Sequence, residues 1–174
     1  MILVNGIPKS GTHALLKAVQ LLGIPDDAVR LEHLPFGLLP DGVNKHIYII
    51  RHPRNVLVSY CRWQNRPVAA GMLIGFMRSF EGKSFADYWQ TFSGWMTDPA
   101  TFVVRYEALL ANSAVIAKIA AYLGVPCLVD AFANIPGLTP TWTGAPSDWS
   151  TVWNRDIDAE WQKDCQGIQE AMGY

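Results

Sequence analysis

A glycine-rich loop near the N-terminus carries the residues best suited to chemistry. Residues 6–13, Gly-Ile-Pro-Lys-Ser-Gly-Thr-His, follow a short apolar run at 2–4 and precede apolar residues at helical spacing. A strand, a glycine-rich loop and a helix N-terminus together present backbone N–H groups and the positive end of a helix dipole to an anion. Lys9 adds a positive charge, and Ser10 and Thr12 add hydroxyl donors. The loop therefore predicts a site for a phosphate-like anion.

The loop departs from the nucleotide-binding pattern G-x-x-x-x-G-K-[ST] at its lysine. Gly6 and Gly11 have the right separation, but Thr12 stands where that pattern has lysine, and Lys9 lies two residues before the second glycine. A lysine at that place reaches over the loop from a different angle than the lysine of an ATPase. An ordinary strand-to-helix turn, in which Gly, Pro and Ser are common, is the alternative interpretation.

A second basic segment follows the apolar run at 46–50. Arg51 comes directly after this run, and Ser59 lies eight residues later, within a predicted helix at 56–63. A planar guanidinium and a hydroxyl suit a second phosphate group. The alternative is an arginine at the edge of the sheet and a solvated serine.

His33 directly follows residues 29–32, which are predicted to form a strand. Because an imidazole can accept a proton from a hydroxyl near neutral pH, His33 is a candidate general base. Glu32 is the weaker candidate, since successive residues of a strand point to opposite faces and the two cannot line one pocket. A structural histidine is the alternative.

The elements that must position these residues alternate between strands and helices. Apolar and β-branched runs predict strands at 2–4, 29–32, 46–50 and 101–105. Helical spacing predicts helices at 15–22, 56–63, 84–96, 113–123 and 156–172, whereas 64–82 resists assignment and 135–150 is typical of a loop.

This alternation predicts a single α/β domain over residues 1–174, a three-layer P-loop-like fold with a central parallel sheet flanked by helices. Ligands of such folds bind at the carboxyl ends of the strands. The Lys9 loop, His33 and Arg51 each follow a predicted strand. We therefore expect all three to meet at one edge of the sheet.

The composition narrows the class of protein. The 174 residues are 50% hydrophobic and 17% charged, which is typical of a globular chain, and the net charge of −1 argues against nucleic acid as the main partner. No apolar run is long enough for a membrane span, and no signal peptide is evident. Cys61, Cys127 and Cys165 form no paired motif, so reduced thiols, a cytoplasmic location and no metal site are expected.

Five segments together resemble the sulfotransferases of cytosolic type that use 3′-phosphoadenosine 5′-phosphosulfate (PAPS). The chain resembles a short, bacterial-like member of that family. Pro8–Thr12 resembles their 5′-phosphosulfate loop, and Tyr48–Tyr60 resembles their 3′-phosphate motif. Arg30–Pro35 is similar to the segment that carries their catalytic histidine. Val104–Glu107 resembles their Tyr-Glu segment, and Gly144–Trp149 resembles the Gly-x-x-Gly-Asp-Trp loop that closes over the nucleotide.

The resemblance implies in-line transfer of the sulfuryl group from PAPS to a hydroxyl or amine of a small-molecule or carbohydrate acceptor, with 3′,5′-adenosine bisphosphate (PAP) as product and no metal. His33 is then the general base, and Lys9 stabilises the leaving phosphate. Ser10 is expected to hold Lys9 aside until the acceptor binds. The cofactor-binding residues that the resemblance implies are Lys9, Ser10, Gly11, Thr12, His13, Arg51, Ser59, Tyr106 and Gly144.

Two departures from the family pattern keep alternatives open. Trp142-Thr-Gly144 stands where the family usually has Arg-Lys-Gly, so part of the 3′-phosphate clamp is missing or is supplied by another residue such as Arg54. Ala14 replaces a tryptophan that often stacks on adenine. One alternative is a small-molecule or nucleotide kinase using ATP and Mg²⁺, and the other is a degenerate member that binds a nucleotide without turnover. The sequence leaves the acceptor and the oligomeric state open.

Overall fold

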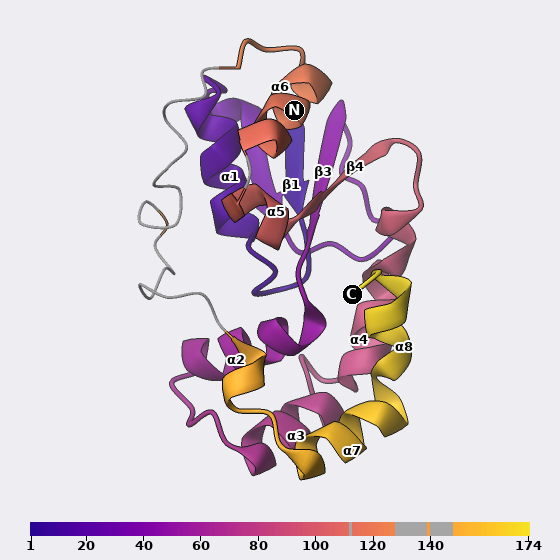
Figure 1. The fold of residues 1–174 in the computed structure, drawn as a ribbon. Coiled ribbons are helices and arrows are strands. Elements are labelled where there is room, and N and C mark those ends of the chain that lie inside the picture. Colours follow the sequence, from indigo (N-terminus) through magenta and orange to yellow (C-terminus); the bar gives the residue numbers. More distant parts are fainter. Residues whose placement is uncertain (112, 128–138, 140–147) are drawn as a thin grey trace.

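Four strands form one parallel sheet in the computed structural model, which describes residues 1–111, 113–127, 139 and 148–174. Their order is β2-β1-β3-β4 (Figure 1). The strands are β1 (Ile2–Asn5), β2 (Val29–Glu32), β3 (Lys45–Ile50) and β4 (Thr101–Arg105). The four predicted strands are confirmed to within a residue at either end; β1 and β3 are largely buried, whereas β2 has no buried residue.

The strand register brings the chemical segments to one edge of the sheet. Asn5, the last residue of β1, lies beside Glu32 of β2 and Tyr48 of β3. Because all the pairs are parallel, the loop at 6–11, His33 and Arg51 leave the sheet at the same edge. The expectation that these segments meet there is confirmed.

One face of the sheet is covered by three helices with small and aliphatic side chains (Figure 1). Val4, Ile47 and Ile49 point to this face and are fully buried. The helices are α1 (Thr12–Leu21), α5 (Tyr106–Ala111) and α6 (Ser113–Leu123). Small residues let α1 approach the sheet closely, and this places its N-terminus directly after the loop.

The opposite face packs against a larger, aromatic core. Tyr48 and Ile50 point to this side, where Phe80, Phe85 and Trp161 are completely buried. The helices are α2 (Pro53–Trp63), α3 (Ala70–Arg78), α4 (Phe85–Ser93), α7 (Arg155–Asp164) and α8 (Gln166–Ala171). The described residues also contain the short 3₁₀ turns η1 (Asp26–Ala28), η2 (Gly94–Met96) and η5 (Trp149–Thr151).

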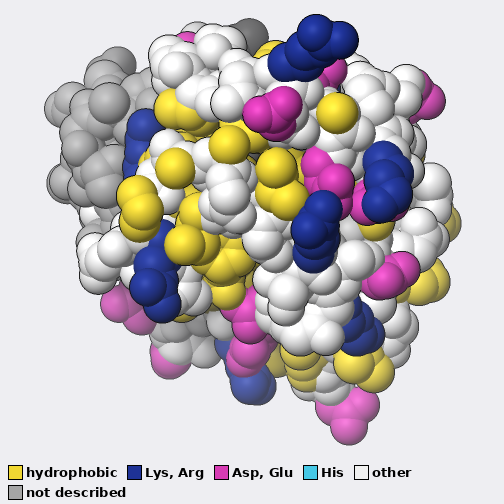
Figure 2. Space-filling view, turned by 90° about the horizontal axis from the view of Figure 1, so that it is seen from below, with side chains coloured by type: hydrophobic (Ala, Val, Ile, Leu, Met, Phe, Trp, Pro, Cys, Tyr) yellow, Lys and Arg dark blue, Asp and Glu magenta, His cyan; other side chains and the backbone are white. Residues whose placement is uncertain are grey.

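The helices α2, α3 and α7 gather at the end of the molecule drawn lowest in Figure 1. Seen from that end, hydrophobic side chains gather at the centre of the surface, among charged ones (Figure 2). Within the described ranges, every helix is too short or too polar to span a bilayer.

Three helix predictions need correction. Residues 64–82, which resisted assignment, contain α3. The single helix predicted at 156–172 is two helices, because the backbone at the buried Cys165 leaves the helical region at φ −124° and separates α7 from α8. The helix predicted at 84–96 ends at Ser93 and continues only as a 3₁₀ turn. In addition, α5 follows β4 directly and was not predicted.

Candidate active site

The loop between β1 and α1 has a strained backbone. Lys9 has φ +70° and Gly11 has φ +103°, both in the left-handed region that is costly for any residue except glycine. A hydrogen bond from Ser10 N to Ile7 O (3.1 Å) holds the turn. Among the described residues no side chain caps α1, so the N–H groups of its first turn are left for a ligand.

Ser10 is fully buried inside this loop, and its Oγ has no hydrogen-bond partner among the described residues. A buried hydroxyl without a partner costs about 1–3 kcal/mol, so the position of Ser10 is not explained by the stability of the loop. Thr12, the first residue of α1, is likewise buried. The predicted anion-binding loop thus has donors that the protein itself does not use.

The ring of Tyr106 packs against the loop at Gly11. Its ring is so close to Gly11 that a Cβ on Gly11 would lie 2.2 Å from it. The side chain is buried, and burial raises the pKa of its hydroxyl. Tyr106 was predicted to contact the cofactor, and in the structure its ring lies under the loop and beside Arg51.

Arg51 joins the end of β3 to the loop. Its Nη1 donates a hydrogen bond to Lys9 O (3.1 Å), and its guanidinium carbon lies 4.3 Å from the centre of the Tyr106 ring. The side chain is 5% exposed, and its Nε has no partner among the described residues. Burial lowers the pKa of Arg51, although Tyr106 and Glu107 oppose this shift. The arrangement is a buried cation with an N–H group still free for an acceptor.

The Lys9 ammonium lies over the ring of Trp63, 4.4 Å from its centre. Burial lowers the pKa of Lys9 to about 8. The expectation that Ser10 holds Lys9 aside is therefore wrong for this state, because the ammonium packs on Trp63 while Ser10 Oγ has no partner. Ser59 is half-buried one helical turn before Trp63, on the same face of α2, and so faces the loop.

His33 is exposed and hydrogen-bonded to the loop through Nδ1, which lies 2.6 Å from Gly6 O. Since a carbonyl oxygen can only accept, Nδ1 must carry the proton, and the neutral ring keeps its lone pair on Nε2. Asn5 strengthens this link: its Oδ1 accepts from both Gly6 N (2.8 Å) and Leu34 N (2.9 Å). A candidate base is thus held against the anion-binding loop.

The alternative base, Glu32, is engaged elsewhere. Its Oε1 accepts from Arg30 Nε at 2.5 Å in an ion pair on β2. A carboxylate held by a guanidinium is a weak proton acceptor. His13 lies on the first turn of α1, and burial first, then the charge of Lys9 and the neighbouring His33, lower the pKa of its imidazole.

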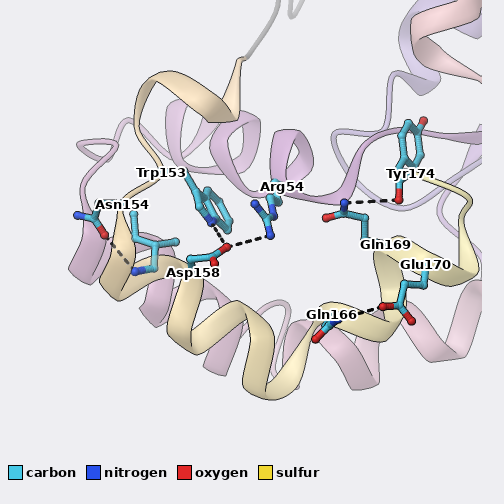
Figure 3. Close-up of polar contacts among 9 residues, drawn as sticks. Arg54, Trp153, Asn154, Asp158, Gln166, Gln169, Glu170 and Tyr174 are labelled. Atoms are coloured by element: carbon cyan, nitrogen blue, oxygen red, sulfur yellow. Dashed lines mark hydrogen bonds and ion pairs between the residues drawn. The ribbon is translucent and has the colours of Figure 1, made fainter.

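Arg54, which was suggested as a replacement for the missing basic residues of the 3′-phosphate clamp, is engaged by other groups of the protein. Its Nη2 donates to Asp158 (3.0 Å), as Figure 3 shows, and its guanidinium lies within 4.4–5.2 Å of the ring centres of Trp149, Trp153 and Trp161. The side chain is 8% exposed. Arg54 therefore stabilises the packing of α7 on α2.

The structure places Lys9, Ser10, Gly11, Thr12, His13, His33, Arg51 and Tyr106 at or beside the loop, and Ser59 on the face of α2 that carries Trp63. Gly144, predicted from the nucleotide-closing loop, lies outside the described residues. Two contributors were missed, Asn5 and Trp63. Asn5 could have been noticed as a polar residue ending an apolar strand directly before the loop, and Trp63 could have been noticed by its helical spacing from Ser59. In the described part of the chain, no cluster of three His, Cys, Asp or Glu residues could hold a metal ion.

Comparisons with known proteins agree with this geometry. A family model for the sulfotransferase domain matches residues 24–135, more than half of the chain. Comparison with curated protein sequences finds no match. Among solved structures, the chain is similar to mouse sulfotransferase SULT7A1 complexed with PAP (TM-score 0.74, 19% identity, 99% of this chain and 85% of that one). It is also similar to retinol dehydratase in complex with androsterone and inactive cofactor PAP (TM-score 0.75, 14% identity, 99% and 80%).

Proposed function

The chain belongs to the sulfotransferase domain family, and we propose that it transfers the sulfuryl group of PAPS to a hydroxyl or amine of a small-molecule or carbohydrate acceptor. The observation that carries this proposal is that the loop before the N-terminus of α1 and the Arg51 guanidinium lie side by side, joined by the hydrogen bond from Arg51 Nη1 to Lys9 O. Among the described residues, no carboxylate forms an ion pair with Lys9 or Arg51. These two cationic groups fit a ligand with two anionic groups.

The residues divide between the two ends of such a ligand. Lys9, Ser10, Thr12 and the uncapped N-terminus of α1 would hold the 5′-phosphosulfate, with His13 beside them. The 3′-phosphate would fall to the Arg51 guanidinium and the hydroxyl of Ser59, with Gly144 as a further expected contact. Tyr106 would support both ends, because its ring contacts Gly11 and Arg51.

PAPS supplies the sulfuryl group that an acceptor receives. His33 accepts the acceptor's proton at Nε2, since Nδ1 is committed to Gly6 O. Lys9 places its positive charge where the phosphate leaves, and the N–H groups of Gly11 and Thr12 are preorganised donors for the same charge. A positioned base of this kind contributes about 10²–10⁴ in rate, and one preorganised donor contributes about 10²–10³.

The acceptor is best supported as a small molecule with an apolar part. Phe36, Leu38 and Leu39 follow His33 closely, and all are exposed, as is Trp63 beside Lys9. Apolar side chains that water reaches next to a reactive group suit an organic acceptor. The similar retinol dehydratase structure contains androsterone, a ligand of that kind. For the protein itself we also propose a cytoplasmic location.

The kinase alternative has less support from the carboxylates near the loop. A kinase needs an acidic residue at a strand end to hold Mg²⁺, but β3 is followed by Arg51. Glu107, after β4, accepts hydrogen bonds from His52 N and Tyr174 Oη instead. The held and oriented His33 favours turnover over the degenerate, non-catalytic alternative.

The test is calorimetric titration of the protein with PAP and, in parallel, with ATP and Mg²⁺, followed by an assay for PAP release from PAPS with a panel of phenols, alcohols, amines and sugars. Tight PAP binding, weak ATP binding and acceptor-dependent PAP release are expected. Preference for ATP with Mg²⁺ would overturn the proposal in favour of a kinase. PAP binding without turnover on any acceptor would favour the degenerate binder.

A further inference from the structure

The residue after Arg51 is held by groups from three distant parts of the chain. His52 N donates a hydrogen bond to Glu107 Oε1 (3.0 Å). The His52 ring stacks on Trp149, with ring centres 5.3 Å apart, and packs against the Tyr174 ring at 5.0 Å. The backbone that carries Arg51 is therefore fixed from its C-terminal side, while Arg51 itself is bonded to the loop.

Both oxygens of the Glu107 carboxylate are occupied by neutral donors. Oε1 accepts from His52 N, and Oε2 accepts from the Tyr174 hydroxyl at 2.6 Å. Tyr174 is itself held, because the Arg105 guanidinium lies 4.6 Å from the centre of its ring. Burial and the bond to Glu107 raise the pKa of Tyr174, so its hydroxyl stays a donor. Glu107 is a carboxylate without an ion pair among the described residues.

Arg51 likewise has no ion pair among the described residues. It is a buried cation, and no carboxylate in the described part of the chain contacts it. A buried charge without a partner is costly, yet the negative charge of Glu107 favours the charged form of Arg51 without touching it. A direct, bidentate pair with Glu107 would stabilise Arg51 more, but it would occupy the donors that a phosphate needs.

We infer that the negative charge of the Glu107 carboxylate stabilises the Arg51 cation, and that the Tyr174 hydroxyl holds this carboxylate in place. Glu107 is bonded to the N–H of the residue after Arg51, and its negative charge favours the charged form of Arg51. The Tyr174 hydroxyl and the His52 N–H keep its oxygens from pairing with the guanidinium, which leaves Arg51 free for the 3′-phosphate. Glu107 and Tyr174 are thus positioning residues that act through Arg51, and this inference rests on the proposed function.

The inference predicts opposite effects for two substitutions. Tyr174→Phe removes the restraint on Oε2 and lets Glu107 compete with the phosphate, so PAP is expected to bind about threefold to tenfold more weakly. Glu107→Gln removes the competitor but keeps an acceptor for His52 N, so PAP is expected to bind at least as tightly as to the wild type. The double variant is expected to recover the affinity that Tyr174→Phe loses.

The measurement is calorimetric titration of each variant with PAP and with adenosine 5′-monophosphate, which lacks the 3′-phosphate. Tyr122→Phe is the matched control, because that hydroxyl bonds backbone oxygens of His46 and Ala100 away from Arg51. The expected result is a loss for Tyr174→Phe that is confined to PAP and reversed in the double variant. Melting temperatures identify any variant that fails to fold.

Four results would overturn the inference. An equal loss for both nucleotides would mean that Tyr174 only supports the fold. A double variant as weak as Tyr174→Phe would remove Glu107 as the competitor. If PAP binds the wild type and Arg51→Ala abolishes that binding, but Tyr174→Phe has no effect, the proposed function stands and the inference falls. A wild type that does not bind PAP would overturn both.

Discussion

Two parts of the molecule lie at the carboxyl ends of the strands: the loop with Arg51, and the segment that follows His33. The first leaves polar groups without partners within the described ranges, and the second leaves apolar side chains exposed. At the loop and Arg51, Ser10, Thr12 and Arg51 are buried, and polar atoms of Ser10 and Arg51 have no partner among the described residues. A few residues after His33, it is apolar surface that is uncovered: Phe36 is 52% exposed and Leu38 is 59% exposed. Buried free donors suit a small, highly charged ligand, whereas exposed apolar groups suit a variable organic one. The difference assigns cofactor affinity to the first part and acceptor recognition to the second.

His33 belongs to both parts. Its Nδ1 is bonded to the loop, yet its ring is exposed beside the apolar segment. The backbone of the segment that follows is held by two hydrogen bonds. Trp95 Nε1 donates to Leu34 O (2.9 Å), and Phe36 N donates to Thr91 O (2.7 Å). The Phe36 ring packs edge-on against Trp95, with ring centres 4.9 Å apart, so the exposed Leu38 and Leu39 side chains are the ones free to adapt to an acceptor.

The largest effect is expected from His33→Ala, which separates the two parts most sharply. Turnover should fall about 10²–10⁴-fold because the base is lost, while the affinity for PAP stays near the wild-type value. Steady-state kinetics with PAPS and calorimetry with PAP measure the two quantities. Glu32→Gln is the control, and its turnover should be nearly normal, since that carboxylate is paired with Arg30. Near-normal turnover of His33→Ala would remove His33 from the chemistry.

Gly11→Ala tests how tightly the buried part is built. The new Cβ would meet the Tyr106 ring at 2.2 Å and would sit at φ +103°, so a loss of about 2–4 kcal/mol in unfolding free energy is expected, together with at least about tenfold weaker PAP binding. Gly23→Ala is the matched control: its φ is +83°, but nothing lies within 4 Å. Strain alone there should cost about 1 kcal/mol. Equal losses in urea unfolding would contradict close packing under the loop.

The charge of Lys9 gives the buried part a pH dependence. With a pKa of about 8 in the free protein, Lys9 is cationic below pH 8 and neutral above it. PAP affinity should therefore fall as the pH rises through 8, by about tenfold over one unit, because the phosphates are already ionised there. Titrations between pH 7 and 9.5 measure the fall. Lys9→Met should bind more weakly and show no such step, and an identical step in that variant would exclude Lys9 as its source.

The smallest effect is expected at the exposed part. Leu38→Ser should change the free energy of unfolding by less than about 0.5 kcal/mol, because the side chain is largely in water already, and it should leave PAP affinity unchanged. Its effect should be confined to the KM for the acceptor. Urea unfolding and calorimetry measure the first two quantities. A clear loss of PAP affinity would show that the two parts are not independent.

Much of this site follows from local sequence. The four strands were predictable because β-branched, apolar runs are buried in a parallel sheet, and Arg51 and His33 could be placed at the edge because each follows such a run. The loop was predictable because a strand, two glycines and a helix start lie within a dozen residues. In these cases the signal and the structure occupy the same stretch of chain.

The remaining contacts depend on packing between distant segments. Tyr174 and Glu107 are 67 positions apart, and Arg54 and Asp158 are 104 apart. Nothing in the sequence near Arg54 indicates that three tryptophans enclose it. The place of Lys9 on Trp63 depends on the direction in which α2 leaves β3, which the sequence pattern does not define. Such contacts could only be found in the structure.

The most direct test of the central claim, that Arg51 and the loop hold two separate phosphate groups, is calorimetry of Arg51→Ala with PAP and with adenosine 5′-monophosphate. Arg155→Ala, at an exposed arginine, is the control for the loss of one positive charge. We expect Arg51→Ala to lose about 10²-fold or more in PAP affinity, as for a buried charge-assisted contact, and to bind the monophosphate almost as the wild type does. Equal losses for the two nucleotides, or no loss for PAP, would contradict the claim.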